Sequence, residues 1–330
     1  MKVSETGEFG LIELIAKAVG RTGDKRLLIG IGDDAACWRA KGLQLATTDT
    51  LIEDIHFSFK NITWRELGWK AMAVNLSDIA AMGGVPLYAL VSLGIPADTE
   101  TDDVIELYKG MLDLAGKHKV RIVGGDTIAS PIAAITLTII GEAGSEEEIL
   151  KRSAARPGDL IAVTGSFGAS AAGLAIMQKR LSLDKKTEKA LREAHFNPMP
   201  RIEEGRTLVK YGVKAAIDVS DGLLGDLGKV CQASGVGAQI YSERIPIRAA
   251  VEKHFGNKAL KLALTGGEDY ELIFTAPPTT INNVAKKLSC RVTIIGKITK
   301  NRAVQVLDAD GNEFSFAVEG WDHFAKRKRA

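Results

Sequence analysis

Residues 216–222 read AIDVSDG, an apolar run that leads directly into Asp218 and Asp221. The same arrangement, an apolar run followed by small residues and then acids, occurs at four other places. These places are residues 28–34 (LIGIGDD), 45–49 (LATTD), 122–126 (IVGGD) and 264–269 (LTGGED). One Gly-Asp pair after a strand is usually only a turn, since both residues tolerate turn geometry. All these places together predict that carboxylates gather at the carboxyl ends of several strands.

A gathered set of carboxylates indicates a bound cation, because like charges destabilise the fold unless they are neutralised. Oxygen ligands of this kind favour magnesium. The adjacent glycines allow the backbone to approach phosphate oxygens closely, which a side chain would prevent. The pattern therefore predicts a site for magnesium and a phosphate-containing ligand.

A further aspartate, Asp78, lies in residues 70–82, a largely apolar stretch with a helical pattern. Asn75 precedes it by three residues, which places both side chains on one face of a helix. So apolar a helix must be mostly buried, and a buried charge needs a partner or a metal. A capped or exposed aspartate is the alternative, and we favour a metal ligand.

The length of 330 residues exceeds the size at which a single core usually stops growing. Composition is that of an ordinary globular protein, with 45% hydrophobic and 25% charged residues. The charged segment 143–157, which contains Gly144 and ends at Pro157, is the best candidate boundary. We therefore expect one domain over residues 1–148 and a second over residues 149–330.

The formal net charge of +2 is too small for the positive field that non-specific nucleic-acid binding requires. Cys37, Cys231 and Cys290 lie far apart and lack paired spacing, as expected for reduced thiols. No apolar stretch approaches the roughly 18 residues of a membrane span. We expect a cytoplasmic protein with neither nucleic acid nor membrane as a partner.

Helical and strand patterns alternate in both halves, which predicts an α/β fold of the α+β type. Thr63 and Glu66 have the spacing of a capping box at the start of a long helix. Helices are expected at residues 8–19, 63–82, 102–118, 170–179, 223–234 and 282–288. Strands are expected at residues 27–29, 43–46, 121–123, 135–140, 160–163, 215–217, 272–274 and 292–295.

Other chemistries find little support in the sequence. The five histidines show no metal-ligand spacing, and no serine lies in a nucleophile-elbow motif. The P-loop pattern is absent as well. Residues 165–168 (GSFG), between a strand and a helix, could hold a phosphate, although a plain turn is at least as plausible.

Six motifs together resemble the thiamine-monophosphate kinase family, and they occur in that family's order. They are residues 30–35 (GIGDDA), 47–50 (TTDT), 75–78 (NLSD), 124–127 (GGDT), 218–222 (DVSDG) and 266–271 (GGEDYE). The match extends from residues 7–9 (GEF) to residues 320–324 (GWDHF). Such a set is far more specific than any single glycine-rich loop.

The resemblance implies a two-domain fold shared with aminoimidazole ribonucleotide synthetase and selenophosphate synthetase. The N-terminal α/β domain would bind ATP and magnesium and pair with its copy in a homodimer. The C-terminal α/β domain would complete the active site, with ATP between the two. The implied reaction is ATP-dependent phosphorylation of thiamine monophosphate to thiamine diphosphate, the last step of thiamine diphosphate biosynthesis.

The resemblance also implies roles for individual residues, carried over by motif. Several magnesium ions would be held by Asp34, Thr47, Thr48, Asp49, Asp78, Asp126, Asp218 and Asp221. ATP would contact Tyr108, Gly125, Asp126, Arg152 and Ser220. Thiamine would contact His56, Glu268 and Trp321. The residues expected to carry catalysis are Asp34, Asp78, Asp126, Asp221 and Arg152.

Without the family, Tyr108 and Trp321 would be interpreted as core aromatics and His56 as a surface or strand residue. Two other functions remain open. The chain could be another ATP-dependent enzyme of the same superfamily, although no cysteine precedes Cys37 to serve as a selenophosphate synthetase nucleophile. It could also be a non-catalytic sensor of Mg-ATP, although a sensor could dispense with several of these acids.

Overall fold

The computed structural model describes residues 1–20, 24–31, 35–179, 181 and 183–314. The chain forms two compact units. The first comprises Met1–Glu148 and Phe196–Ile202, and the second comprises Ile149–His195 and the chain from Glu203 onward. Residues 196–202 thus belong with the first unit, whereas the domain boundary expected between residues 148 and 149 would place them in the second. Both units combine helices with a sheet, as the predicted α/β class requires.

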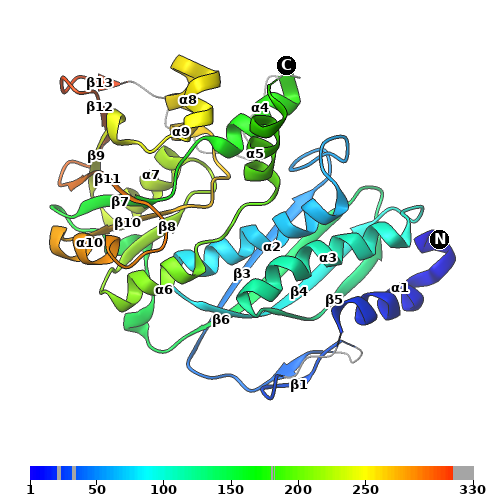
Figure 1. Ribbon diagram of the computed structural model, residues 1–330. Coiled ribbons are helices and arrows are strands. Elements are labelled where there is room, and N and C mark those ends of the chain that lie inside the picture. Colours follow the sequence, from blue (N-terminus) through cyan, green and yellow to red (C-terminus); the bar gives the residue numbers. More distant parts are fainter. Residues whose placement is uncertain (21–23, 32–34, 180, 182, 315–330) are drawn as a thin grey trace. The chain divides into compact units, whose positions relative to one another are not determined.

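A four-stranded sheet in the order β3-β6-β4-β5 forms the centre of the first unit. The pair β4–β5 is parallel, and the other pairs are antiparallel. Helices α2 and α3 lie side by side across one face of this sheet (Figure 1). The elements of the unit are α1 (Val3–Val19), β1 (Leu27–Ile29), β2 (Cys37–Trp38), β3 (Leu43–Ile52), α2 (Trp64–Ala81), β4 (Val85–Ile95), α3 (Thr101–His118), β5 (Arg121–Ala129), β6 (Ala134–Ala143) and a short 3₁₀ turn (Glu146–Glu148).

The two faces of this sheet differ in burial. Ile135, Leu137 and Ile139 of β6 have no exposed surface, because they point toward the helices. Thr136 and Thr138 alternate with them and are half-buried on the opposite face. We call these the covered face and the open face. Strands β1 and β2 cover one end of the open face, where the rings of Trp38 and Tyr88 lie 5.2 Å apart.

Helices α2 and α3 cross very closely because each has a glycine at the crossing. A Cβ atom on Gly68 would lie 1.9 Å from the carbonyl oxygen of Leu107. A Cβ atom on Gly110 would lie 1.9 Å from the carbonyl oxygen of Arg65. The two glycines therefore determine how closely α2 and α3, which pack on the covered face, approach each other.

The predicted capping box at the start of α2 is confirmed. Thr63 Oγ1 accepts a hydrogen bond of 3.2 Å from the backbone N–H of Glu66. Glu66 Oε2 accepts one of 2.8 Å from the backbone N–H of Thr63. This cap fixes the first turn of the helix that carries Asp78.

A seven-stranded sheet in the order β13-β12-β9-β11-β7-β10-β8 forms the centre of the second unit. Within this sheet, as far as the structure describes it, β12–β9 is the one parallel pair, and the other pairs are antiparallel. Its strands are β7 (Leu160–Thr164), β8 (Ala215–Asp218), β9 (Gly237–Tyr241), β10 (Leu272–Ala276), β11 (Val292–Thr299), β12 (Val304–Leu307) and β13 (Glu313–Phe314). Its α-helices are α4 (Ala169–Lys179), α5 (Lys185–Phe196), α6 (Ile202–Lys210), α7 (Leu223–Ser234), α8 (Ala249–Phe255), α9 (Ala259–Thr265) and α10 (Pro278–Ala285).

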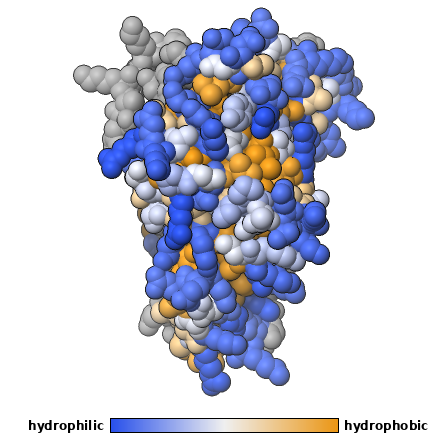
Figure 2. Space-filling view, turned by 90° about the vertical axis from the view of Figure 1, so that its left-hand side faces the viewer, coloured by the Kyte–Doolittle hydropathy of each residue, from blue (hydrophilic) through white to orange (hydrophobic). Residues whose placement is uncertain are grey.

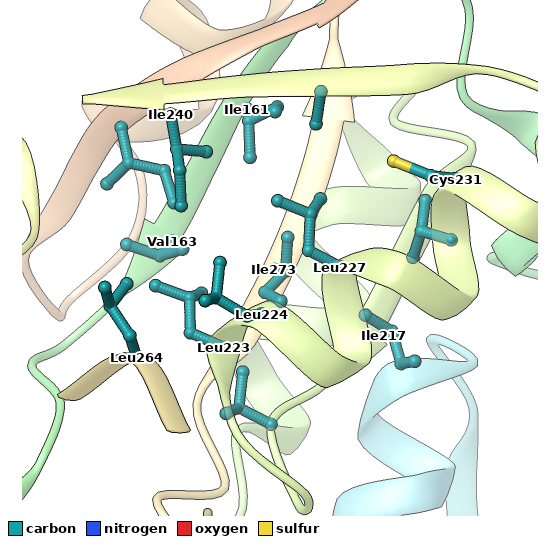
Figure 3. Close-up of a cluster of buried hydrophobic side chains, with 14 of the residues drawn as sticks. Ile161, Val163, Ile217, Leu223, Leu224, Leu227, Cys231, Ile240, Leu264 and Ile273 are labelled. Atoms are coloured by element: carbon teal, nitrogen blue, oxygen red, sulfur yellow. The ribbon is translucent and has the colours of Figure 1, made fainter. Parts of the chain in front are cut away.

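Helix α7 packs its apolar face on this sheet, as Figure 3 shows. Leu223, Leu224 and Leu227 of the helix meet Ile217 of β8 and Ile273 of β10, and all of them are buried. This contact fixes the short loop between β8 and α7, which contains Asp221 and directly follows Asp218 at the end of β8.

Three of the predicted strand ends are wrong. Asp49 and Asp126 lie inside β3 and β5, because threonine and isoleucine after each acid continue the strand on an edge that tolerates a charge. Residues 264–265 end helix α9, since the alanines and leucines before them favour a helix. Asp218 does end a strand as predicted. Asp33 and Asp34 lie outside the described residues.

None of the helices in the described part of the chain is long and apolar enough to cross a membrane. Hydrophilic residues cover most of the face drawn in Figure 2, and apolar residues form separate patches between them. The three cysteines carry free thiols, as predicted.

Candidate active site

In the first unit, two predicted metal ligands lie in contact. Thr47 Oγ1 of β3 donates a hydrogen bond of 2.5 Å to Asp78 Oδ2 of α2. Asp78 is half-buried, whereas most of α2 around it is fully buried, as predicted. Asp49 lies two residues after Thr47 in the same strand and therefore faces the same side of the sheet. These three residues form an oxygen-rich group on the covered face.

Asn75 adds an amide oxygen one helical turn before Asp78. Its side chain has no exposed surface, and its Nδ2 donates to the carbonyl of Ala71 at 3.1 Å. Its Oδ1 has no hydrogen-bond partner among the described residues. A buried oxygen without a donor is unfavourable unless a ligand or ion completes it, and hard oxygen donors suit magnesium. The residues around Asp78 therefore fit a magnesium ion.

Two further residues predicted to bind magnesium, Thr48 and Asp126, lie on the open face. Thr48 Oγ1 donates to the carbonyl of Leu137 at 3.0 Å and accepts from Thr138 Oγ1 at 3.1 Å. Asp126 is exposed, and its Oδ1 accepts the backbone N–H of Thr127 at 2.9 Å. Side chains on opposite faces point away from each other, so the two sets fit separate ions better than one shared ion.

Gly125, predicted to contact ATP, lies in β5 where its backbone approaches the neighbouring strand very closely. Its φ angle is +154°, and a Cβ atom there would lie 1.8 Å from the carbonyl oxygen of Val91. Only glycine fits this position. The absent side chain also leaves the backbone beside Asp126 accessible.

His56 and Tyr108 occupy very different surroundings. His56 follows β3, is half-buried, and accepts the backbone N–H of Ile52 on Nδ1 at 3.0 Å. The proton of the neutral ring is therefore on Nε2. Tyr108 lies inside α3 with 3% of its surface exposed, and burial raises the pKa of its hydroxyl. The structure gives Tyr108 the surroundings of a core aromatic, and its contact with ATP remains a prediction.

In the second unit, backbone hydrogen bonds hold two of the motif loops together. Glu268 N–H donates to the carbonyl of Ser220 at 2.8 Å, and Tyr270 N–H donates to that of Val219 at 2.9 Å. Val219 N–H in turn donates to the carbonyl of Glu271 at 2.8 Å. The loop after β8 and the loop before β10 therefore form one continuous structure.

This pairing brings Ser220 and Asp221 beside Glu268, and Asp218 precedes them at the end of β8. Asp218 is buried, with 3% of its surface exposed, whereas the other three are half-buried. Gly267 permits the close approach: its φ angle is +70°, and a Cβ atom there would lie 2.7 Å from the Ser220 carbonyl oxygen. Residues predicted to contact magnesium, ATP and thiamine thus share one loop pair.

Comparison with known proteins identifies the family. The models of AIR synthase related protein match in order, the N-terminal domain at residues 32–143 and the C-terminal domain at residues 156–308. Thiamine-monophosphate kinase of Salmonella typhimurium is 39% identical over 330 residues, which cover 97% of this chain and 98% of that protein. The chain belongs to the thiamine-monophosphate kinase family.

Solved structures agree with this assignment. The thiamine-monophosphate kinase of Stenotrophomonas maltophilia K279a matches with a TM-score of 0.82 and 35% identity, over 92% of this chain and 97% of that one. A structure of AaThiL complexed with AMPPCP and TMP matches with a TM-score of 0.77 and 35% identity, over 98% and 99%. The predicted family, the two-domain AIR-synthase-like fold and the thiamine-phosphate kinase class are confirmed.

The predicted site of a thiamine-monophosphate kinase is only partly brought together within either unit. Among the described residues, no three acidic, histidine or cysteine side chains converge as a complete metal site. Arg152 lies exposed in a 3₁₀ turn of the second unit (Arg152–Ala154), and its carbonyl accepts Ser234 Oγ at 2.8 Å. Asp34 and Trp321 lie outside the described residues.

Sequence reasoning missed a charged cluster around Asp221. Lys229 Nζ lies 2.5 Å from Asp221 Oδ2 and 2.7 Å from Asp226 Oδ1, and the Asp221 N–H donates to Asp226 Oδ2 at 2.9 Å. Asp226 has no exposed surface, and its burial raises the pKa of its carboxyl. The hydrogen bond from Lys229 and its positive charge lower that pKa in part. The i,i+3 spacing of Asp226 and Lys229 at the start of a predicted helix was the available signal.

Sequence reasoning also missed the role of Asp269. Its carboxylate accepts the backbone N–H groups of Gly168, at 2.9 Å, and Ser170, at 3.4 Å, at the N-terminus of α4. The phosphate position considered for residues 165–168 is therefore taken by an internal carboxylate. Burial raises the pKa of Asp269 to about 7, while these two N–H groups lower it.

The titration of Asp269 predicts how stability depends on pH. Its pKa in the folded protein lies above that of an unfolded aspartate, about 4, so the folded state binds the proton more tightly. The resulting stabilisation is complete below the unfolded pKa and is lost as pH rises through about 7. From pH 5 to pH 8, we expect wild type to lose on the order of 2 kcal/mol of unfolding free energy relative to Asp269→Asn.

Urea unfolding of both proteins at the two pH values measures this difference. The exposed Asp98 offers a matched control, since Asp98→Asn should track wild type at both pH values. An unfolding free-energy difference between wild type and Asp269→Asn that is the same at pH 5 and pH 8 would contradict the assignment.

Proposed function

We propose that this chain transfers the γ-phosphoryl group of ATP directly to the phosphate of thiamine monophosphate, forming thiamine diphosphate and ADP. One observation carries the proposal: the loop of Ser220 and Asp221, which follows Asp218, is hydrogen-bonded to the loop of Glu268. Residues suited to phosphates and magnesium are thereby fixed beside a carboxylate suited to a cationic ring. The solved structure of a family member, AaThiL complexed with AMPPCP and TMP, supports the same pair of ligands.

The chain's own residues can perform this reaction without a general base, because a phosphate acceptor is already ionised at neutral pH. Asp78, Asp126, Asp218 and Asp221 would hold several magnesium ions, with Asp34, Thr47, Thr48 and Asp49 as the remaining ligands. Bound magnesium would neutralise the charge of the two phosphate-bearing substrates. Arg152 would offset negative charge on the transferred group, and Glu268 would bind the cationic thiamine.

We propose further that the protein is cytoplasmic and forms a homodimer through the first unit. The open face of its sheet supports this pairing. Ile128 is 56% exposed there, Leu90 is half-buried, and the hydroxyls of Thr50 and Thr136 lie 2.8 Å apart across β3 and β6. A second copy would bury these groups. Light scattering should give twice the chain mass of 35.3 kDa, and a single-chain mass would contradict the dimer.

Product analysis tests the kinase proposal. Purified protein is incubated with ATP, magnesium and thiamine monophosphate, and the products are separated by chromatography. Free thiamine in place of the monophosphate, and omission of magnesium, serve as controls. We expect diphosphate only in the complete mixture, whereas diphosphate formed equally well from free thiamine, or none at all, would overturn the proposal.

A further inference from the structure

His195, which the proposed reaction does not use, lies against Glu268 inside the second unit. It is near the end of α5 and only 4% exposed. Its Nδ1 is 3.2 Å from Glu268 Oε2 and 3.0 Å from Ser170 Oγ. The side chain of Glu268 is 32% exposed. The partly exposed carboxylate of Glu268 is therefore in contact with the buried ring of His195.

Hydrogen-bond chemistry fixes where the proton of this ring lies. An ionised glutamate can accept but cannot donate a hydrogen bond, so Nδ1 must carry the hydrogen that faces Glu268. Ser170 Oγ then shares the same N–H as a second acceptor. A hydrogen bond to a carboxylate is stronger than one between neutral groups and favours the charged form of the acid. The contact therefore holds the Glu268 carboxylate in one position.

The backbone of Glu268 is constrained as well. Its φ angle is +57°, in the left-handed region that residues with a side chain rarely adopt. The hydrogen bond from the Glu268 N–H to the Ser220 carbonyl holds the backbone in this conformation. The next residue, Asp269, directs its carboxylate to the N-terminus of α4, so the two adjacent acids have separate tasks. Asp269 stabilises the fold, whereas the Glu268 carboxylate lies beside His195 with 32% of its side-chain surface exposed.

We infer that His195 is a positioning residue for substrate recognition, which holds the Glu268 carboxylate in place to receive the cationic part of thiamine monophosphate. This inference rests on the proposed function, in which Glu268 contacts that part of the substrate. A carboxylate that is fixed in advance loses little freedom on binding, so it binds the cation more tightly than a mobile one. His195 does not touch the reacting phosphates in this account. Its loss should weaken binding of the monophosphate and leave binding of ATP unchanged.

Two amide variants test the position of the N–H group. In His195→Asn the side-chain amide nitrogen lies near the place of Nδ1, whereas in His195→Gln it lies near the place of Nε2. Both are polar and smaller than histidine, so they are comparably disruptive to packing. We expect His195→Gln to raise KM for thiamine monophosphate about 10-fold, the scale for one charged hydrogen bond. His195→Asn should stay within about threefold of wild type, and KM for ATP should not change in either.

Glu268→Gln separates this inference from the proposed function. If Glu268→Gln raises KM for thiamine monophosphate while both His195 variants behave alike, the positioning role of His195 is overturned and the role of Glu268 stands. If Glu268→Gln leaves that KM unchanged, the proposed substrate contact itself is wrong, and the inference falls with it. A rise in KM for ATP equal to that for the monophosphate would show that His195 only supports the fold. Thermal unfolding of each variant confirms that folded protein is being compared.

Discussion

Asp78→Asn is expected to lower kcat by roughly 10²- to 10³-fold while the protein remains folded. Asparagine keeps an oxygen that can accept the hydrogen bond from Thr47 Oγ1, so the link between β3 and α2 survives. It removes the negative charge that would hold magnesium beside the phosphates. Loss of one preorganised electrostatic contact typically has this effect on turnover. Steady-state rates of thiamine diphosphate formation at saturating substrates measure it.

Asp113→Asn provides the control, because Asp113 is an exposed acid on α3 that pairs with Arg65 and is not among the predicted site residues. Its kcat should equal that of wild type. Asp221→Asn should behave like Asp78→Asn, since both are predicted magnesium ligands. Near-normal turnover in both Asp78→Asn and Asp221→Asn would contradict a mechanism in which these carboxylates hold magnesium.

Gly110→Ala is expected to destabilise the folded protein by about 3 kcal/mol. The new methyl group would lie 1.9 Å from the Arg65 carbonyl oxygen, a backbone atom that cannot move without shifting α2. The two helices would have to separate, which opens space beneath the apolar covered face. Urea unfolding measures the loss.

Gly116→Ala in the same helix is the matched control. A Cβ atom at Gly116 would have no neighbour within 4 Å, and the position is exposed. Alanine is the better helix former, so this variant should gain about 0.5 to 1 kcal/mol. Equal stability of the two variants would mean that the helix crossing is not set by glycine.

The predicted helices and strands were confirmed where the sequence pattern is strongly periodic, as in α2, α3 and β6. Strand β4, at the centre of the first sheet, was not predicted. Its residues 85–95 read VPLYALVSLGI, a largely apolar run without alternation, and most of them are buried, on both sides of the strand. Periodicity alone does not separate such a strand from a buried helix.

The candidate site could be predicted as a set of residue types, but its arrangement could not. The alternation of β3 divides Thr47 from Thr48, although they are adjacent in the sequence. The contact of His195 with Glu268 joins residues from distant elements, and no spacing rule connects them. Local sequence therefore predicts which residue types the candidate site contains, and tertiary pairing of loops determines which of these side chains lie together.

Transfer of label from ATP tests the central claim most directly. Protein is incubated with magnesium, thiamine monophosphate and ATP labelled with ³²P in its γ-phosphate, and labelled products are counted after separation. Direct phosphoryl transfer predicts one labelled thiamine diphosphate for each ADP formed, with the label in its terminal phosphate. Formation of ADP with the label in inorganic phosphate, and none in thiamine diphosphate, would contradict the account.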